Sequence, residues 1–185
     1  MARTTTTKTT QTTRMNGKRV RIVTTTSAAG TSVKVEEAPV LEWQLQAAAV
    51  RSLKAMPEYA ASAARVGPHS FTLAADMNGD YRSKRAAVIA KATGIAAGDP
   101  DLRVYLHGGN LKLIEYKNAE GTPTASQRVR HPLLAALGHP VVTLKVATEE
   151  EAAERSVALV RGWLSTAPQC ANDNHTATTL PASAC

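Results

Sequence analysis

Residues 98–127 read GDPDLRVYLHGGNLKLIEYKNAEGTPTASQ, and this stretch decides the expected fold and site. Apolar and polar side chains alternate over residues 102–107, and strand-forming types dominate residues 111–116. Residues 108–110, Gly-Gly-Asn, lie between the two runs. Two runs of this kind joined by a short glycine-containing loop predict a β-hairpin.

Three charged side chains are expected to meet at the open end of this hairpin. Antiparallel pairing about the loop brings Asp101 level with Glu115 and Lys117. Because side chains alternate along a strand, Glu115 and Lys117 share one face and Tyr116 points to the other. A slip of one residue in the register would reverse that face, so the alignment is a prediction that coordinates can test.

These residue types suit hydrolysis of phosphodiester bonds. Two neighbouring carboxylates repel each other unless a cation lies between them, and oxygen ligands favour Mg²⁺ or Mn²⁺. We expect Asp101, Glu115 and the backbone carbonyl of Tyr116 to hold such an ion, with Lys117 positioning water or stabilising charge on the phosphate. Taken singly, Glu-x-Lys is commonly a solvated ion pair and Gly-x-Pro-Asp a turn. Their combination on one hairpin favours the catalytic interpretation.

The order of motifs around the hairpin resembles the VRR-NUC family, a branch of the PD-(D/E)xK nuclease superfamily, in its stand-alone phage and bacterial form. The resemblance covers about residues 40–165. It rests on Glu42 and Gln46 in a Glu-x-x-x-Gln helix, residues 78–84 and 91–94 before Gly-x-Pro-Asp-Leu, Gly121, Thr124 and Gln127 after the hairpin, and the strand at residues 138–142.

The resemblance implies a role for each matching position. It implies that Asp101 and Glu115 are the metal carboxylates, that Lys117 is the catalytic lysine, that Glu42 adds a further metal-site carboxylate from the first helix, and that Gln127 lies at the edge of the site. Two alternatives remain open. Glu42 also fits a first-turn acid that favours the helix dipole, and Thr124 with Gln127 has the spacing of a capping box.

Position 99 departs from the family pattern, because it is usually apolar and here is Asp99. An acid there could tune metal affinity or be mistaken for the ligand; we assign the ligand to Asp101, the Asp after Pro. His131 and His139 flank an apolar helix and are expected to be packing or surface residues. No zinc spacing occurs in the sequence.

The expected fold is therefore α/β, a restriction-endonuclease-like sandwich with a central mixed β-sheet flanked by helices. The expected function is that of a metal-dependent endodeoxyribonuclease, selective for branched DNA such as four-way junctions and acting as a homodimer in a bacterial or phage-infected cytoplasm. A nonspecific or restriction-type nuclease, and a DNA-binding module that does not cleave, are the alternatives. Further elements are expected at residues 40–56, 124–137 and 149–164 (helices) and 70–75 and 141–147 (strands).

Charge is concentrated at the N-terminus. The chain has 185 residues and a formal net charge of +7, and residues 1–35 contain seven basic residues and no acid. Residues 1–39 are rich in threonine, and their low hydrophobicity predicts a disordered tail. Such a basic tail either attracts the phosphate backbone through counterion release or is a solvated extension with no role.

Two further segments complete the expected organisation. A basic helix over residues 81–93 carries Arg82, Lys84, Arg85 and Lys91, which either form its solvent face or contact DNA phosphates. Residues 166–185 predict a disordered C-terminal tail with Cys170 and Cys185, which form no disulfide framework and fit a reducing compartment. No secretion signal and no membrane-spanning apolar run is apparent, so no membrane partner is expected.

Overall fold

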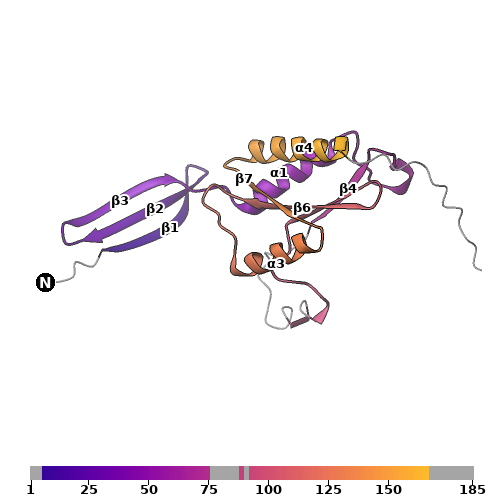
Figure 1. The fold of residues 1–185 in the computed structure, drawn as a ribbon. Coiled ribbons are helices and arrows are strands. Elements are labelled where there is room, and N and C mark those ends of the chain that lie inside the picture. The colour runs from indigo at the N-terminus through magenta and orange to yellow at the C-terminus, as the bar shows by residue number, and fades with distance from the viewer. Residues whose placement is uncertain (1–5, 76–87, 90–91, 167–185) are drawn as a thin grey trace, which may run out of the picture.

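The computed structural model describes residues 6–75, 88–89 and 92–166, and these residues form two separate sheets with helices packed on one of them (Figure 1). The elements in chain order are β1 (Thr7–Met15), β2 (Lys18–Ser27), β3 (Gly30–Glu37), α1 (Glu42–Lys54), η1 (Ala63–Arg65), β4 (Phe71–Ala75), β5 (Leu102–Leu106), β6 (Asn110–Lys117), α3 (Ala125–Ala136), β7 (Val141–Lys145) and α4 (Glu149–Thr166).

The larger sheet is mixed, as the sequence predicted. Its strand order is β4-β5-β6-β7, in which β4–β5 and β5–β6 pair antiparallel while β6–β7 pair parallel. The parallel pair requires a crossover, and α3 provides it. The described chain is thus a mixed α/β protein. The predicted helices at residues 40–56, 124–137 and 149–164, the hairpin, and the strands at residues 70–75 and 141–147 differ from the observed elements by only a few residues at their ends.

The core lies between this sheet and the pair α1 and α4, while α3 lies on the opposite side (Figure 1). The inward side chains of β5 are Leu102, Val104 and Leu106, and those of β6 are Ile114 and Tyr116. Strand alternation therefore directs Glu115 and Lys117 away from the apolar core, towards α3. The hydroxyl groups of Tyr116 and Ser156 of α4 lie 2.9 Å apart in a hydrogen bond, which ties this register to the helix layer.

The prediction of disorder for residues 1–39 is wrong over residues 7–37. These residues form a three-stranded antiparallel sheet, β1-β2-β3, which extends from one end of the molecule (Figure 1). Threonine is β-branched and favours strands despite its polarity. Asn16 and Gly17, at φ 50° and 79°, make the two-residue turn between β1 and β2. Asn-Gly is the preferred sequence for that turn, so the signal was present in the sequence.

Other predictions fall outside the described residues. Arg82, Lys84, Arg85 and Lys91 of the predicted basic helix are among them, and so are residues 167–185 of the predicted C-terminal tail. Within the described ranges, none of the helices has the length and apolar character that crossing a membrane requires.

Candidate active site

The hairpin places Asp101 and Glu115 on the same face of the sheet. Leu102 pairs with Ile114, so Asp101 is the next position and lies opposite Glu115. The Oδ2 atom of Asp101 accepts a hydrogen bond of 2.8 Å from the backbone N–H of Tyr116. The backbone carbonyl of Asp101 accepts another, of 2.9 Å, from Nε2 of Gln46 on α1. Two hydrogen bonds, one from β6 and one from α1, therefore hold the start of β5 in place.

Lys117 lies between two carboxylates. Its Nζ atom is 2.7 Å from Oε1 of Glu115 and 3.0 Å from Oε2 of Glu42. Both strand residues are buried, with 1% of Glu115 and 4% of Lys117 exposed. Burial alone would lower the pKa of Lys117, but the hydrogen bonds to Glu115 and Glu42 outweigh it and raise that pKa. Lys117 is thus a fixed positive charge and not a proton acceptor at neutral pH.

Glu42 has the position that the first-turn interpretation predicted and also forms an ion pair with Lys117, while its role as a metal ligand stays a prediction. It is the first residue of α1, where its charge favours the helix dipole, and it also reaches the site through Lys117. The loop after β6 closes over this pair at Gly121. A Cβ atom there would lie 2.6 Å from Oε1 of Glu42 and 3.2 Å from Cδ of Lys117, so a larger residue would displace the Glu42 and Lys117 side chains.

Gln127 is both a helix cap and a site residue. Its Oε1 atom accepts the N–H of Thr124 at 2.9 Å, and its own N–H donates to Oγ1 of Thr124 at 3.2 Å, which completes the predicted capping box. With the carbonyl end of the amide engaged by the cap, the Nε2 end donates to Oε1 of Glu115. The start of α3 therefore orients the Glu115 carboxylate.

His131 is a site residue that the sequence reasoning set aside. Its Nε2 atom lies 3.9 Å from Oε2 of Glu115, and both atoms are buried without a hydrogen-bond partner. Burial, and then the charge of Lys117, lower the pKa of His131, so the ring is neutral at pH 7. Its spacing of four from Gln127 puts both side chains on one face of α3, and that was the available signal.

The carboxylate pair has the properties expected of a cation site. Burial and the neighbouring charge of Glu115 raise the pKa of Asp101 to about 6. Oε2 of Glu115 is buried and free of hydrogen bonds. A divalent cation would relieve the repulsion and give this oxygen a partner. Among the described residues no ready-made group of three or more His, Cys, Asp or Glu ligands is found, so Asp101 and Glu115 would need backbone or water oxygens as well.

Asp99 is occupied by structural contacts. Its Oδ2 atom is 2.8 Å from a guanidinium nitrogen of Arg103, and its Oδ1 atom is 2.6 Å from Nε of Arg130. Arg130 belongs to α3, so Asp99 links the turn before β5 to that helix. This leaves Asp101 as the acid of the turn with an uncompensated carboxylate, which supports its assignment over Asp99.

Comparisons of this chain with models of known protein families, with characterised proteins and with solved structures found no match. The family suggested by the motif residues is therefore a proposal that rests on those residues and on the geometry around them.

Proposed function

We propose that this protein is a metal-dependent endonuclease with a restriction-endonuclease-like sandwich fold, of the VRR-NUC type within the PD-(D/E)xK nucleases. The observation that carries the proposal is the position of Asp101 and Glu115 on one face of a β-hairpin, with the ammonium group of Lys117 2.7 Å from Glu115. A buried pair of carboxylates beside a lysine, with the pKa of Asp101 raised, is typical of functional sites.

The chain's own residues divide the chemical work. Asp101, Glu115 and the Tyr116 carbonyl would hold Mg²⁺ or Mn²⁺, which supplies Lewis-acid activation of water and phosphate when bound. Lys117, kept protonated, stabilises the negative charge that develops on the phosphate. Gln127 and Glu42 are positioning residues, because they act on the substrate only through Glu115 and Lys117.

The substrate class follows from the resemblance to stand-alone phage and bacterial nucleases. We propose branched DNA, including four-way junctions, cut by a homodimer that presents two sites to two strands. A nonspecific or restriction-type nuclease and a non-cleaving DNA-binding module are the competing functions. Asp101, Glu115 and Lys117 are all present and lie together, and this complete set favours cleavage over binding alone.

The test is cleavage of a synthetic four-way junction by the full-length chain in Mn²⁺ and in Mg²⁺, with linear duplex, flap and plasmid substrates in parallel. Wild type should cut the junction fastest, and Lys117→Ala and Asp101→Asn should cut it at least about 100-fold more slowly. Lys54→Ala, an exposed lysine at the end of α1, is the matched control and should cut like wild type. Equal cutting by all four proteins would show that the assigned site is wrong, and equal cutting of all substrates would favour a nonspecific nuclease.

A further inference from the structure

The N-terminal sheet, β1 to β3, has two faces of different charge. Its register assigns every side chain to a face, because directly paired residues in an antiparallel sheet point the same way. One face carries five basic residues and one acid, namely Lys8, Arg14, Arg19, Arg21, Lys34 and Glu36. The opposite face carries one of each sign, Lys18 and Glu37, beside Val20, Ile22, Val33 and Val35. We call the first the basic face.

Internal ion pairs account for only part of the basic face. Glu36 is 2.5 Å from Arg21 and 2.7 Å from Lys34, which leaves no acid on this face for the others. Arg14 is exposed and directly opposite Arg19, and the guanidinium of Arg19 donates to the carbonyl of Pro39 at 2.8 Å. Like charges placed opposite each other destabilise a sheet, and no described carboxylate offsets Arg14 here. A polyanion bound on this face would offset the positive charge of Arg14.

Neutral donors accompany these charges. On the basic face, Thr10 and Thr12 lie between Lys8 and Arg14 on β1, and Thr25 lies opposite Lys8 on β2. Threonine hydroxyls and the cationic groups of arginine and lysine are among the side chains that bind phosphate oxygens of a nucleic acid backbone. An exposed sheet face with regularly spaced donors, whose single acid is already paired with Arg21 and Lys34, therefore suits a phosphate backbone better than an acidic peptide of irregular charge.

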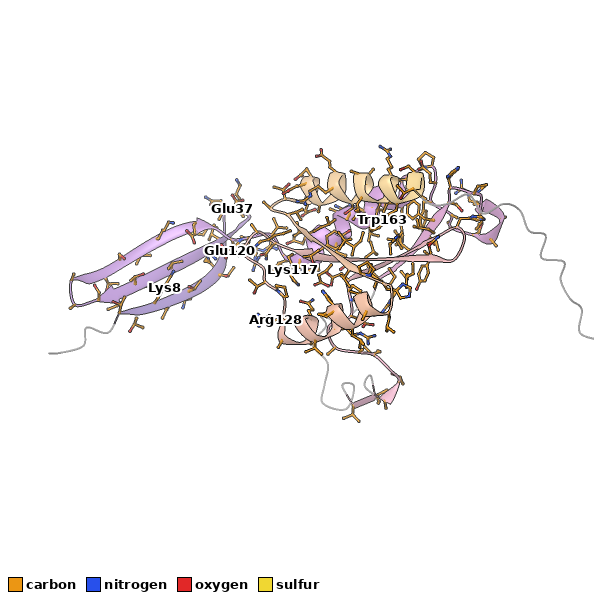
Figure 2. All side chains as sticks on the ribbon, viewed as in Figure 1. Lys8, Glu37, Lys117, Glu120, Arg128 and Trp163 are labelled. Carbon is orange, nitrogen blue, oxygen red and sulfur yellow. The ribbon has the colours of Figure 1, made fainter. Side chains whose placement is uncertain are left out.

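The basic face adjoins the candidate active site. Arg21 donates to both carboxylate oxygens of Glu120, at 2.6 and 2.9 Å, and Glu120 is only three positions beyond Lys117 in the chain. Lys8 lies on the same face of the sheet as Arg21. Figure 2 shows Lys8 on the sheet, Glu120 where the sheet meets the rest of the molecule, and Lys117 just beyond it. A bound backbone could thus continue from the sheet towards Asp101 and Glu115.

We propose that the basic face of the N-terminal sheet binds the sugar-phosphate backbone of duplex DNA beside the active site, through Lys8, Arg14 and Arg19. The choice of DNA rests on the proposed function, but the binding does not depend on cleavage. The sheet acts as a sequence-independent contact that holds one arm of the substrate, so its contribution is electrostatic and sensitive to salt.

The test compares two charge reversals that flank the same turn on opposite faces, Arg14→Glu and Lys18→Glu. Both change the net charge by the same amount, so only the face differs. Binding of the full-length proteins to a fluorescently labelled duplex is measured by anisotropy in EDTA, over a range of salt concentrations. Arg14→Glu should weaken binding by about tenfold or more and reduce the log–log salt slope by about 1, while Lys18→Glu should stay within about threefold of wild type.

Further variants keep the result decisive. Lys8→Glu combined with Arg14→Glu should lower the slope by about 2, and Arg14→Gln should lower it by about 1 without placing an acid on the strand. Equal losses for Arg14→Glu and Lys18→Glu would show that only net charge matters and would overturn the proposal. Tighter, Arg14-dependent binding to phosphatidylserine vesicles than to the duplex would overturn it in favour of a membrane surface.

The outcomes separate this proposal from the proposed nuclease activity. If Arg14→Glu weakens DNA binding in EDTA more than Lys18→Glu does, but the wild-type protein cuts no substrate in Mn²⁺, DNA binding by the basic face would be supported and the nuclease activity rejected. If the wild-type protein cleaves the junction but Arg14→Glu binds DNA as tightly as wild type, DNA binding by the basic face would be rejected and the nuclease activity would be supported.

Discussion

Among the described residues, two positively charged side chains each form ion pairs with two carboxylates. One of them lies on the larger sheet and the other on the N-terminal sheet. Lys117 lies between Glu115 and Glu42, and Arg21 lies between Glu36 and Glu120. The side chains of Lys117 and Glu115 are 6% and 1% exposed, whereas those of Arg21 and Glu36 are 25% and 26% exposed. Hydrogen bonds from Lys34 and Arg21 lower the pKa of Glu36, and one from Arg21 lowers the pKa of Glu120. The outer cluster is therefore charged at neutral pH, and the surrounding water screens its ion pairs and keeps their contribution to stability small. The inner cluster has little water, and its charges therefore control one another's protonation.

The largest expected effect is removal of one carboxylate from each cluster. Glu115→Gln keeps an amide oxygen as acceptor but removes the negative charge that pairs with Lys117. Removing one partner of a buried ion pair costs about 3–5 kcal/mol; Glu42 still faces Lys117, so we expect the lower end. Glu36→Gln in the outer cluster should leave stability unchanged within error. Urea unfolding of both variants measures the difference. Similar midpoints for the two would show that the inner cluster is as well solvated as the outer one.

The second prediction concerns pH. The pKa of Asp101 in the fold is about 6, above its ordinary value of 3.8, so its neutral form is favoured by folding. This contribution is fully present below pH 3.8 and is lost as the pH rises through 6, by on the order of 2 kcal/mol. Asp101→Asn should therefore be more stable than wild type at pH 8 in EDTA, and the gap should close towards pH 4.

Mn²⁺ provides the control for that measurement. Added at pH 8, it should raise the melting temperature of wild type and leave Asp101→Asn nearly unchanged, because the ion would neutralise the same repulsion. A melting temperature of wild type that is insensitive to both pH and Mn²⁺ would show that Asp101 and Glu115 do not form a cation site.

A smaller effect is expected where the turn before β5 meets α3. Gly98 has φ 84°, and a Cβ atom there would lie 2.6 Å from the backbone carbonyl carbon of Ser126. Gly98→Ala should cost about 1–3 kcal/mol through overpacking, in addition to the strained φ. Gly94 also has a positive φ, of 86°, but open space around it. Gly94→Ala therefore introduces backbone strain without overpacking, and comparing it with Gly98→Ala separates the two effects. Equal losses in thermal unfolding would mean that α3 moves aside without penalty.

The smallest effect is expected in the N-terminal sheet. Gly17 has φ 79° and nothing within 4 Å of an added Cβ, so Gly17→Ala should cost about 1 kcal/mol through backbone strain alone. Amide hydrogen exchange should show faster exchange in β1 and β2 and no change in β5 and β6. Loss of protection in β6 would show that the two sheets unfold as one unit.

The sequence predicted the hairpin because local signals agreed there: alternation over residues 102–107, strand-forming residues over 111–116 and glycines between them. It failed for residues 7–37 because composition was given more weight than pattern. Low hydrophobicity argued for disorder, whereas the Asn16-Gly17 turn and the run of β-branched residues argued for strands. The contact of His131 with Glu115 and the ion pair between Asp99 and Arg130 depend on where α3 packs against the hairpin, so the spacing of His131 from Gln127 could show a shared helix face but not these contacts.

The sequence by itself determined which residues share a face, since the period of a strand is two and that of a helix is close to four. It therefore determined that Glu115 and Lys117 point together, and that Gln127 is followed by His131 on one side of a helix. Only the tertiary structure decided how those faces meet. Burial against α3 raises the pKa of Asp101, leaves Oε2 of Glu115 without a partner and turns a solvated motif into a candidate metal site, because the strength of a charge's interactions depends on how much water the surrounding fold excludes.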